Sequence, residues 1–190
     1  MKEKIQKYFQ TVSNNFQLLE KQTQNIESAS NIIIDSLKKR NKIIFCGNGG
    51  SAADSQHLAA ELLGRYKFDR NPLPAISLTV DTSALTAIAN DYGYDHVFSR
   101  QLLGLGKKGD VLFCMSTSGN SKNVIEAINI AKQLEIKIIS LTGCNDSEIS
   151  KKSDICIKAT SLETNHIQEM HIAIGHLICE IVEENFFKKT

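Results

Sequence analysis

The sequence predicts a doubly wound α/β domain built around a parallel sheet, and two observations support this prediction. Short runs rich in β-branched residues recur along the chain, and segments with the apolar spacing of a helix separate them. Parallel strands need crossover connections, which are usually helices, so this alternation is typical of a sheet covered on both faces. We expect a single domain over residues 1–190, because no linker, repeat or low-complexity segment divides the chain.

Additional helices are predicted at both ends of the chain. Near the start, apolar residues recur every three or four positions, which places them along one stripe of a first helix. They are Ile5, Phe9, Val12, Phe16 and Leu19. A second helical segment covers residues 26–37 and completes an N-terminal region of residues 1–40. A long apolar helix from about Ile167 to Phe187, in a C-terminal region of residues 164–188, should close the chain.

The α/β core is predicted over residues 41–160, and each of its strands is a short apolar run. The five runs are residues 42–46, 75–80, 110–115, 137–141 and 154–157. The helical segments between them and after them are residues 52–63, 83–90, 96–105, 123–134 and 147–151. The only prolines, Pro72 and Pro74, indicate a turn before the second strand.

Composition restricts the function classes. A chain of 190 residues with 42% hydrophobic and 23% charged residues resembles an ordinary globular enzyme domain. A net charge of +1 argues against a broad nucleic-acid surface, and no run approaches the roughly 18 apolar residues of a membrane span. The first residues lack the apolar segment of a signal peptide, and the five cysteines show no CxxC spacing. We therefore expect a cytoplasmic protein with reduced thiols.

The first candidate site follows the first predicted strand. Residues 47–51 read Gly-Asn-Gly-Gly-Ser, and the helix expected after them carries His57 and Glu61 on one face. Glycines let backbone N–H groups approach an anion, and the helix N-terminus adds its positive end. The His/Glu pair can hold a metal ion or act as acid and base, although such pairs are also common on solvated surfaces. Together these features indicate an active site for a phosphorylated small molecule.

The second candidate site follows the third predicted strand. Residues 116–121 read Ser-Thr-Ser-Gly-Asn-Ser and precede a helix expected from about Asn123. Four hydroxyls at a helix N-terminus can donate to one phosphate monoester. Helix capping is the alternative, but one cap needs only one hydroxyl. Since open α/β sheets bind ligands at the carboxyl ends of their strands, both loops are expected to line one crevice.

The last predicted helix adds two polar candidates, Gln168 and His176, which interrupt its apolar series. His171 points elsewhere, and we expect it to be a satisfied or exposed histidine. In a regular helix Gln168 and His176 lie about 12 Å apart along the axis and roughly 80° apart around it, so they cannot easily share one ion. Either the first turn of the helix is looser, or ligands come from different subunits.

These motifs resemble the sugar isomerase (SIS) domain family, whose fold is flavodoxin-like, and within it the enzymes that isomerise sedoheptulose 7-phosphate. The matching segments follow the family's order over nearly the whole chain. They are residues 46–51, His57 with 61–66, 90–91, 98–100, 116–121, 141–143, and 167–169 with His176. Glu61 and His176 narrow the resemblance to the isomerases. The family commonly has arginine where this chain has His166.

The resemblance implies an enzyme that converts D-sedoheptulose 7-phosphate to D-glycero-D-manno-heptose 7-phosphate through an enediol, the first step of bacterial heptose synthesis for lipopolysaccharide or capsule. It implies proton transfer by Glu61 and His176. It also implies one Zn²⁺ per subunit, held by His57, Glu61, Gln168 and His176. The residues that it implies for substrate binding are Asn48, Gly49, Gly50, Ser51, Glu61, Asn90, Asp91, Ser116, Thr117, Ser118, Ser121 and Gln168.

The resemblance further implies a homotetramer with active sites at subunit interfaces. The apolar surfaces of the first and last helices agree with such an assembly, and we expect them to pack between subunits and bring His176 near the Glu61 of a neighbour. Two alternatives stay open. A non-catalytic SIS protein that binds a sugar phosphate or the replication initiator would not need Glu61 and His176. A dinucleotide-binding oxidoreductase would use the Gly-rich run but would leave the four hydroxyls unexplained.

Overall fold

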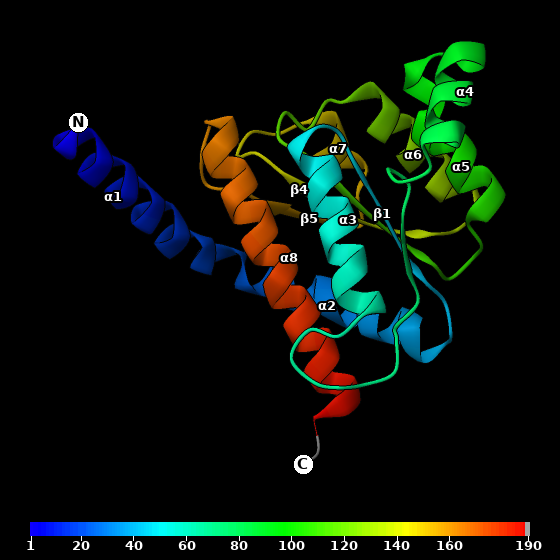
Figure 1. Ribbon diagram of the computed structural model, residues 1–190, viewed down its shortest axis with the longest axis horizontal. Helices are drawn as coiled ribbons and strands as arrows, with labels where there is room; N and C mark the ends of the chain where they lie inside the picture. The colour runs from blue at the N-terminus through cyan, green and yellow to red at the C-terminus, as the bar shows by residue number, and fades with distance from the viewer. Residues whose placement is uncertain (189–190) are drawn as a thin grey trace.

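The centre of the computed structural model, which describes residues 1–188, is a sheet of five parallel strands (Figure 1). The strands are β1 (Ile43–Gly47), β2 (Ala75–Ser77), β3 (Val111–Ser116), β4 (Lys137–Thr142) and β5 (Ile155–Lys158). Their order is β2-β1-β3-β4-β5, which is the flavodoxin-like order of a doubly wound sheet. The predicted fold class and the five predicted strands are confirmed.

Helices precede, connect and follow these strands. They are α1 (Lys2–Leu18), α2 (Thr23–Lys38), α3 (Gly50–Leu63), α4 (Thr82–Tyr92), α5 (Val97–Leu105), α6 (Lys122–Gln133), α7 (Glu148–Lys152) and α8 (Thr164–Phe187). Two short 3₁₀ turns, η1 (Leu19–Gln22) and η2 (Tyr94–His96), precede α2 and α5. Within residues 1–188, none of the helices combines the length and the apolarity needed to cross a membrane.

Each face of the sheet carries its own apolar core. Successive side chains of a strand point to opposite faces, so neighbouring residues of β1 enter different cores. Phe45 packs with residues of α2, α3 and α8, whereas Ile44 packs with residues of α5 and α6. The central strands β1 and β3 are buried at every residue, which explains why they appear in the sequence as continuous apolar runs.

Element boundaries differ from expectation where polar residues begin or end an element. β2 ends at Ser77 instead of Val80, because a turn follows directly. α8 begins at Thr164, the first residue of the predicted C-terminal region. The apolar periodicity starts only at about Ile167, because the first turn of the helix is polar. α3 begins at Gly50, inside the Gly-rich run, so the loop and the first turn of the helix overlap.

Helix α1 projects from the body of the molecule (Figure 1). It contains no buried residue, and Phe9 is 66% exposed. Its clearest contact with α8 is made by Tyr8, whose hydroxyl donates to the Glu169 carboxylate and whose ring lies 4.9 Å from that of His166. The predicted helix is confirmed, but of its apolar stripe only Leu19, just past the end of α1, joins a core of its own chain.

Candidate active site

Two loops meet at the carboxyl edge of the sheet, as the sequence predicts. β1 and β3 are neighbours, with Gly47 opposite Met115. The loop of residues 47–51 after β1, here called the Gly-rich loop, therefore lies beside the loop of residues 116–121 after β3, here called the Ser/Thr loop. The strand order reverses at this point, which is where open α/β sheets bind ligands.

The Gly-rich loop has room for backbone but little for side chains. A Cβ atom at Gly47 would lie 2.7 Å from the Cβ of Ser51, and one at Gly50 would lie 2.6 Å from Gln168 Nε2. Gly49 precedes α3 with a φ of 56°, a backbone conformation that glycine adopts most easily. The N–H groups of Ser51 and Ala52 donate to Asn48 O and Gly49 O at 3.0 Å each, which holds the loop in a tight turn at the start of α3.

The hydroxyls of the Ser/Thr loop bond one another instead of capping α6. Ser116 Oγ lies 2.9 Å from Ser121 Oγ and 3.4 Å from Ser118 Oγ. Ser121 occupies the N-cap position, but its side chain makes no cap hydrogen bond. Thr117 and Ser118 line an open pocket together with Leu162 of the segment before α8. Capping of α6 therefore does not explain the hydroxyls, of which those of Ser116, Ser118 and Ser121 lie together near the N-terminus of this helix.

A pair of amide side chains joins the Gly-rich loop to the first turn of α6. The side chains of Asn48 and Asn123 exchange two hydrogen bonds of 2.8 Å each, and Asn123 is only 3% exposed. The Tyr94 hydroxyl donates to Asn48 Oδ1 at 3.1 Å. Sequence reasoning missed Asn123 and Tyr94 as site residues. A signal for the first was available, because Asn123 directly precedes the apolar residues of α6.

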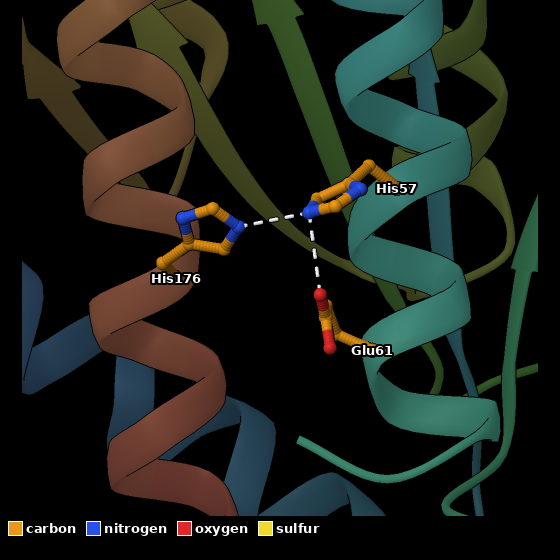
Figure 2. Close-up of side chains that lie close together, drawn as sticks. All are labelled: His57, Glu61 and His176. Atoms are coloured by element: carbon orange, nitrogen blue, oxygen red, sulfur yellow. Dashed lines mark hydrogen bonds and ion pairs between the residues drawn. The ribbon is translucent and has the colours of Figure 1, made fainter. Parts of the chain in front are cut away.

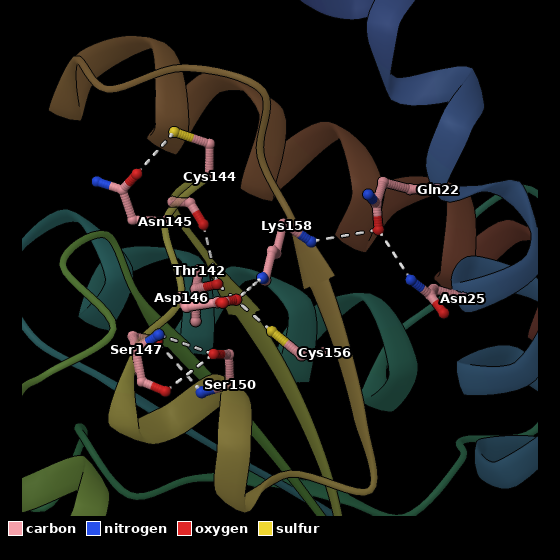
Figure 3. Close-up of polar contacts among 11 residues, drawn as sticks. Gln22, Asn25, Thr142, Cys144, Asn145, Asp146, Ser147, Ser150, Cys156 and Lys158 are labelled. Atoms are coloured by element: carbon pink, nitrogen blue, oxygen red, sulfur yellow. Dashed lines mark hydrogen bonds and ion pairs between the residues drawn. The ribbon is translucent and has the colours of Figure 1, made fainter.

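The turn after β4 supports the Ser/Thr loop from the other side. The Gly143 N–H donates to Thr117 O at 3.1 Å, and the Ile149 N–H donates to Gly119 O at 3.0 Å. Figure 3 shows how this turn is itself held: Lys158 of β5 pairs with Asp146, and reciprocal bonds between the Ser147 and Ser150 residues form the capping box of α7. The backbone of the Ser/Thr loop is therefore fixed by its neighbours.

Three of the predicted metal ligands meet between α3 and α8 (Figure 2). His57 Nε2 lies 2.9 Å from His176 Nε2 and 3.2 Å from Glu61 Oε1. One ligand atom from each of His57, Glu61 and His176 lies within 4.8 Å of the other two. Two imidazole nitrogens and a carboxylate oxygen are a frequent zinc set that leaves one position for water or substrate. We call these three residues the His/Glu cluster.

The close approach of α3 and α8 depends on a glycine beside the cluster. A Cβ atom at Gly175 would lie 2.5 Å from Leu58 Cδ1, so the residue before His176 lets α8 lie against the residue after His57. One expectation was wrong: His176 lies beside the Glu61 of its own chain, without any neighbour. The reason is that α3 and α8 cover the same face of the sheet and pack in the same core.

Gln168 lies apart from the His/Glu cluster. α8 is helical from Thr164 onward, so a looser turn at Gln168 is excluded. The Gln168 side chain lies against Gly50, at the first turn of α3. Gly50 is about 10 Å from His57 along that helix. In its own chain Gln168 therefore lies beside the Gly-rich loop, and its role as a metal ligand stays a prediction.

Other candidates lie outside both loops and the cluster. Asn90 and Asp91 are exposed in the last turn of α4 and are hydrogen-bonded to each other at 2.8 Å, and their contact with the sugar stays a prediction. His171 is fully buried with Nε2 3.1 Å from Thr142 O, but its Nδ1 is buried without a hydrogen-bond partner, so the expected satisfied histidine is only half satisfied. Burial lowers the pKa of His171 to about 4, against the opposing effect of that hydrogen bond. His166 lies 2.9 Å from Glu169 through Nδ1.

Comparisons with known proteins agree with this geometry. The parallel sheet and its hydroxyl-rich loop are those of a SIS domain, and the model of the SIS domain family matches residues 7–143. The chain is 51% identical over 187 residues to the phosphoheptose isomerase of Akkermansia muciniphila, covering 98% of this chain and 99% of that one. It is 54% identical over 166 residues to that of Aliarcobacter butzleri, covering 87% and 88%.

Solved structures give the same result. The phosphoheptose isomerase of Neisseria gonorrhoeae superimposes with a TM-score of 0.91 at 42% identity, covering 96% of this chain and 98% of that one. That of Francisella tularensis gives a TM-score of 0.92 at 33% identity, covering 96% and 97%. The chain belongs to the phosphoheptose isomerase family of SIS domain enzymes.

Proposed function

We propose that the chain converts D-sedoheptulose 7-phosphate to D-glycero-D-manno-heptose 7-phosphate, the first step of bacterial heptose synthesis. The observation that carries this proposal is the juxtaposition of Glu61 and His176, an acid–base pair, in a family member that also keeps the complete Ser/Thr loop. A non-catalytic SIS protein would need the loop but not the pair. Isomerisation of a phosphorylated sugar needs both the loop and the pair.

The reaction requires two proton transfers at adjacent carbons. The Glu61 carboxylate is suited to remove a proton from C1 of the ketose, which leaves an enediol. The His176 imidazole is suited to return a proton at C2, while the two oxygens exchange theirs to give the aldose. Both side chains are half-buried, so they can meet a substrate and still be partly shielded from water. His57, 2.9 Å from His176, orients that imidazole.

The phosphate at the other end of the substrate fits the Ser/Thr loop. Hydroxyls of Ser116, Thr117, Ser118 and Ser121 at the N-terminus of α6 can donate to its oxygens once they release one another. Asn48, Gly49, Gly50, Ser51 and Gln168 around the Gly-rich loop are then placed to contact the sugar chain. This arrangement explains why the two parts of the site lie apart: the phosphate and the reacting carbons are at opposite ends of a seven-carbon molecule.

The His/Glu cluster fits a zinc ion. His57, Glu61 and His176 would hold it, and the family resemblance adds Gln168 as a fourth ligand. When bound, zinc supplies positive charge that stabilises negative charge on the substrate oxygens. Metal analysis of the purified protein should give one zinc per chain, and exhaustive chelation at neutral pH should remove activity that zinc restores. A metal-free protein with full activity would contradict this assignment.

The assembly we propose is a homotetramer with its active sites at subunit interfaces. Two exposed apolar surfaces support it: the α1 stripe, with Phe9 66% exposed, and a groove between α2 and α8 that Ile34, Leu177 and Ile181 line. Both would be covered by further copies of the chain. Light scattering should report four chains, and deletion of residues 1–20 should reduce that number.

Turnover of the proposed substrate is the direct test. Purified protein incubated with sedoheptulose 7-phosphate should produce an aldoheptose phosphate, detected by NMR from its anomeric signals. The unphosphorylated sugar, under the same conditions, should be a very poor substrate. Binding of the phosphosugar without any turnover would favour the regulatory alternative.

A further inference from the structure

The two helices that carry the His/Glu cluster are also joined below it, by residues that the proposed reaction does not use. α3 ends at Leu63, and the chain then crosses the end of α8 before it returns to β2. The crossing segment, residues 64–71, contains no helix or strand. A segment of this kind would leave the last turn of α3, which holds Glu61, free to fray unless other groups bind its carbonyl oxygens.

Arg70 binds those carbonyl oxygens. Its side chain is 1% exposed, although arginine is rarely fully buried. One terminal nitrogen donates to the backbone oxygen of Glu61 at 2.8 Å. The other donates to the oxygens of Leu62 at 2.8 Å, Gly64 at 3.1 Å and Asn71 at 3.1 Å. The guanidinium group thus occupies the C-terminal end of α3, where a cation is favoured by the helix dipole.

Glu183 holds this guanidinium group from α8. The carboxylate is 1% exposed, and its Oε1 accepts hydrogen bonds from Arg70 Nε at 2.7 Å and from the Tyr66 N–H at 2.9 Å. Its Oε2 accepts from the N–H groups of Lys67 at 2.6 Å and Phe68 at 3.2 Å. Burial by itself raises the pKa of Glu183, but these backbone donors and Arg70 outweigh it and lower the pKa overall. The carboxylate therefore stays charged.

We propose that Arg70 and Glu183 are positioning residues that set the distance between Glu61 on α3 and His176 on α8. The proposal rests on the function proposed above. α3 and α8 touch at Leu58 and Gly175 beside the cluster, and the Arg70–Glu183 pair fixes them a second time on the far side of Glu61. Leu62, in the last turn of α3, is buried in the same core as Ile178 and Val182 of α8, and the Arg70–Glu183 pair adds directional hydrogen bonds to these apolar contacts.

The position of Glu61 depends on the Arg70–Glu183 pair because Arg70 donates a hydrogen bond to the backbone oxygen of Glu61. Catalytic groups need to stay within a fraction of an ångström of their working positions, and a displacement of about 1 Å can cost a hundredfold in rate. The substrate-binding loops lie at the opposite end of α3. Loosening the pair should therefore lower kcat and metal affinity while leaving KM nearly unchanged.

A matched control is available directly before β3, in a carboxylate with partners of the same kind. Asp110 is a fully buried carboxylate that accepts hydrogen bonds from the N–H groups of Lys42 and Lys107 and pairs with the Lys42 ammonium at 2.6 Å. Asp110 resembles Glu183 because it is fully buried and because it too bonds backbone N–H groups and one basic side chain. Its side chain bonds Lys42 and Lys107 and no residue of α3 or α8, so loss of its charge should destabilise the fold without loosening the two helices that carry the cluster.

The experiment compares Glu183→Gln, Arg70→Lys and Asp110→Asn in the full-length protein, at a temperature where thermal melts show each variant folded. We expect Glu183→Gln and Arg70→Lys to lower kcat about tenfold or more, with KM changed less than twofold, and to weaken Zn²⁺ binding about tenfold in competition with a chelator. Asp110→Asn should lose a comparable amount of thermal stability but keep kcat and Zn²⁺ affinity. Equal kcat and Zn²⁺ affinity in all three folded variants would overturn the proposal.

A further readout separates this proposal from the proposed function. The imidazole NMR signals of His57 and His176 in the metal-free protein, assigned with single-histidine variants, report the geometry of the cluster without substrate or metal. Glu183→Gln should shift both signals, and Asp110→Asn should shift neither. If the wild type failed to isomerise the sugar phosphate, the proposed function would be rejected. The NMR signals would still test whether Arg70 and Glu183 position the cluster. Unmoved signals in Glu183→Gln would reject the positioning role.

Discussion

The two halves of the candidate site are built in opposite ways. The Ser/Thr loop takes all its hydroxyls from residues 116–121, so one turn of backbone places the whole group. The His/Glu cluster takes His57 and Glu61 from α3 and His176 from α8, residues separated by more than a hundred positions in the chain. The half proposed to bind phosphate is therefore a local structure, whereas the half proposed to transfer protons depends on how two helices pack.

This difference teaches which perturbations each half should tolerate. A single lost hydroxyl in the Ser/Thr loop leaves other donors that can partly replace it. In the His/Glu cluster each side chain has its own proposed role, and no neighbouring group in the cluster could replace it. Substitutions in the cluster should therefore affect kcat strongly, and substitutions in the loop should affect mainly KM.

The largest effect is expected for Glu61→Gln. The amide keeps the size of the side chain but removes the base, so kcat should fall by about 10²–10⁴-fold. The thermal melting temperature should barely change. The matched control is Glu135→Gln, at an exposed glutamate 66% accessible at the opposite edge of the sheet, which should keep full activity. A Glu61→Gln variant with more than about a tenth of wild-type kcat would exclude general-base catalysis by this residue.

His176→Gln should lower kcat to a similar or slightly smaller extent, because the amide cannot deliver a proton at neutral pH. Steady-state kinetics and zinc content measured on the same sample separate its two proposed roles. Zinc retained with activity lost would favour proton transfer, whereas zinc lost together with activity would favour metal binding. An active variant would remove His176 from the mechanism.

His171, a buried histidine of α8 outside both halves of the site, should make the stability of the fold depend on pH. It lies on α8 and bonds Thr142 O, beside the turn that supports the Ser/Thr loop. Its pKa of about 4 in the folded protein lies below the 6.5 of an unperturbed histidine, so between these values the unfolded chain binds a proton that the folded one does not. The contribution of His171 to the free energy of unfolding is therefore complete above pH 6.5, and it falls by up to about 3 kcal/mol as the pH drops to 4.

Urea unfolding at pH 7 and pH 5 measures this contribution. The free energy of unfolding of the wild type should fall more between these pH values than that of His171→Gln, which has no imidazole to protonate. Identical losses in the two proteins would show that His171 does not titrate on unfolding in this range.

The smallest of these effects is expected in the binding half. Ser118→Ala or Ser121→Ala alone should raise KM only slightly, because the remaining donors replace one lost hydroxyl. The two together should raise KM about tenfold or more, since the loss then amounts to at least one hydrogen bond to a charged group, worth roughly 1.5–3 kcal/mol. kcat should change little. Initial-rate kinetics on the two single variants and the double variant provide the check, and a KM unchanged in the double variant would mean that this loop does not bind the phosphate.

Sequence by itself determined the sheet, the helices around it and the two loops. The buried strands β1 and β3 are continuous apolar runs, and the loops after them are short segments whose glycines and hydroxyls act through adjacent backbone. Such features depend on residues close together in the chain, so local pattern is enough to find them. The four hydroxyls of residues 116–121 are the clearest case.

Only the tertiary structure decided which distant residues meet. His176 joins His57 within one chain because Gly175 lets α8 approach Leu58, and Gln168 reaches Gly50 because it lies two turns earlier on the same helix. Arg70 gave no local signal at all, since its partners are backbone oxygens and a carboxylate on another helix. Packing of side chains from separate elements sets these contacts, and periodicity along the chain carries no information about it.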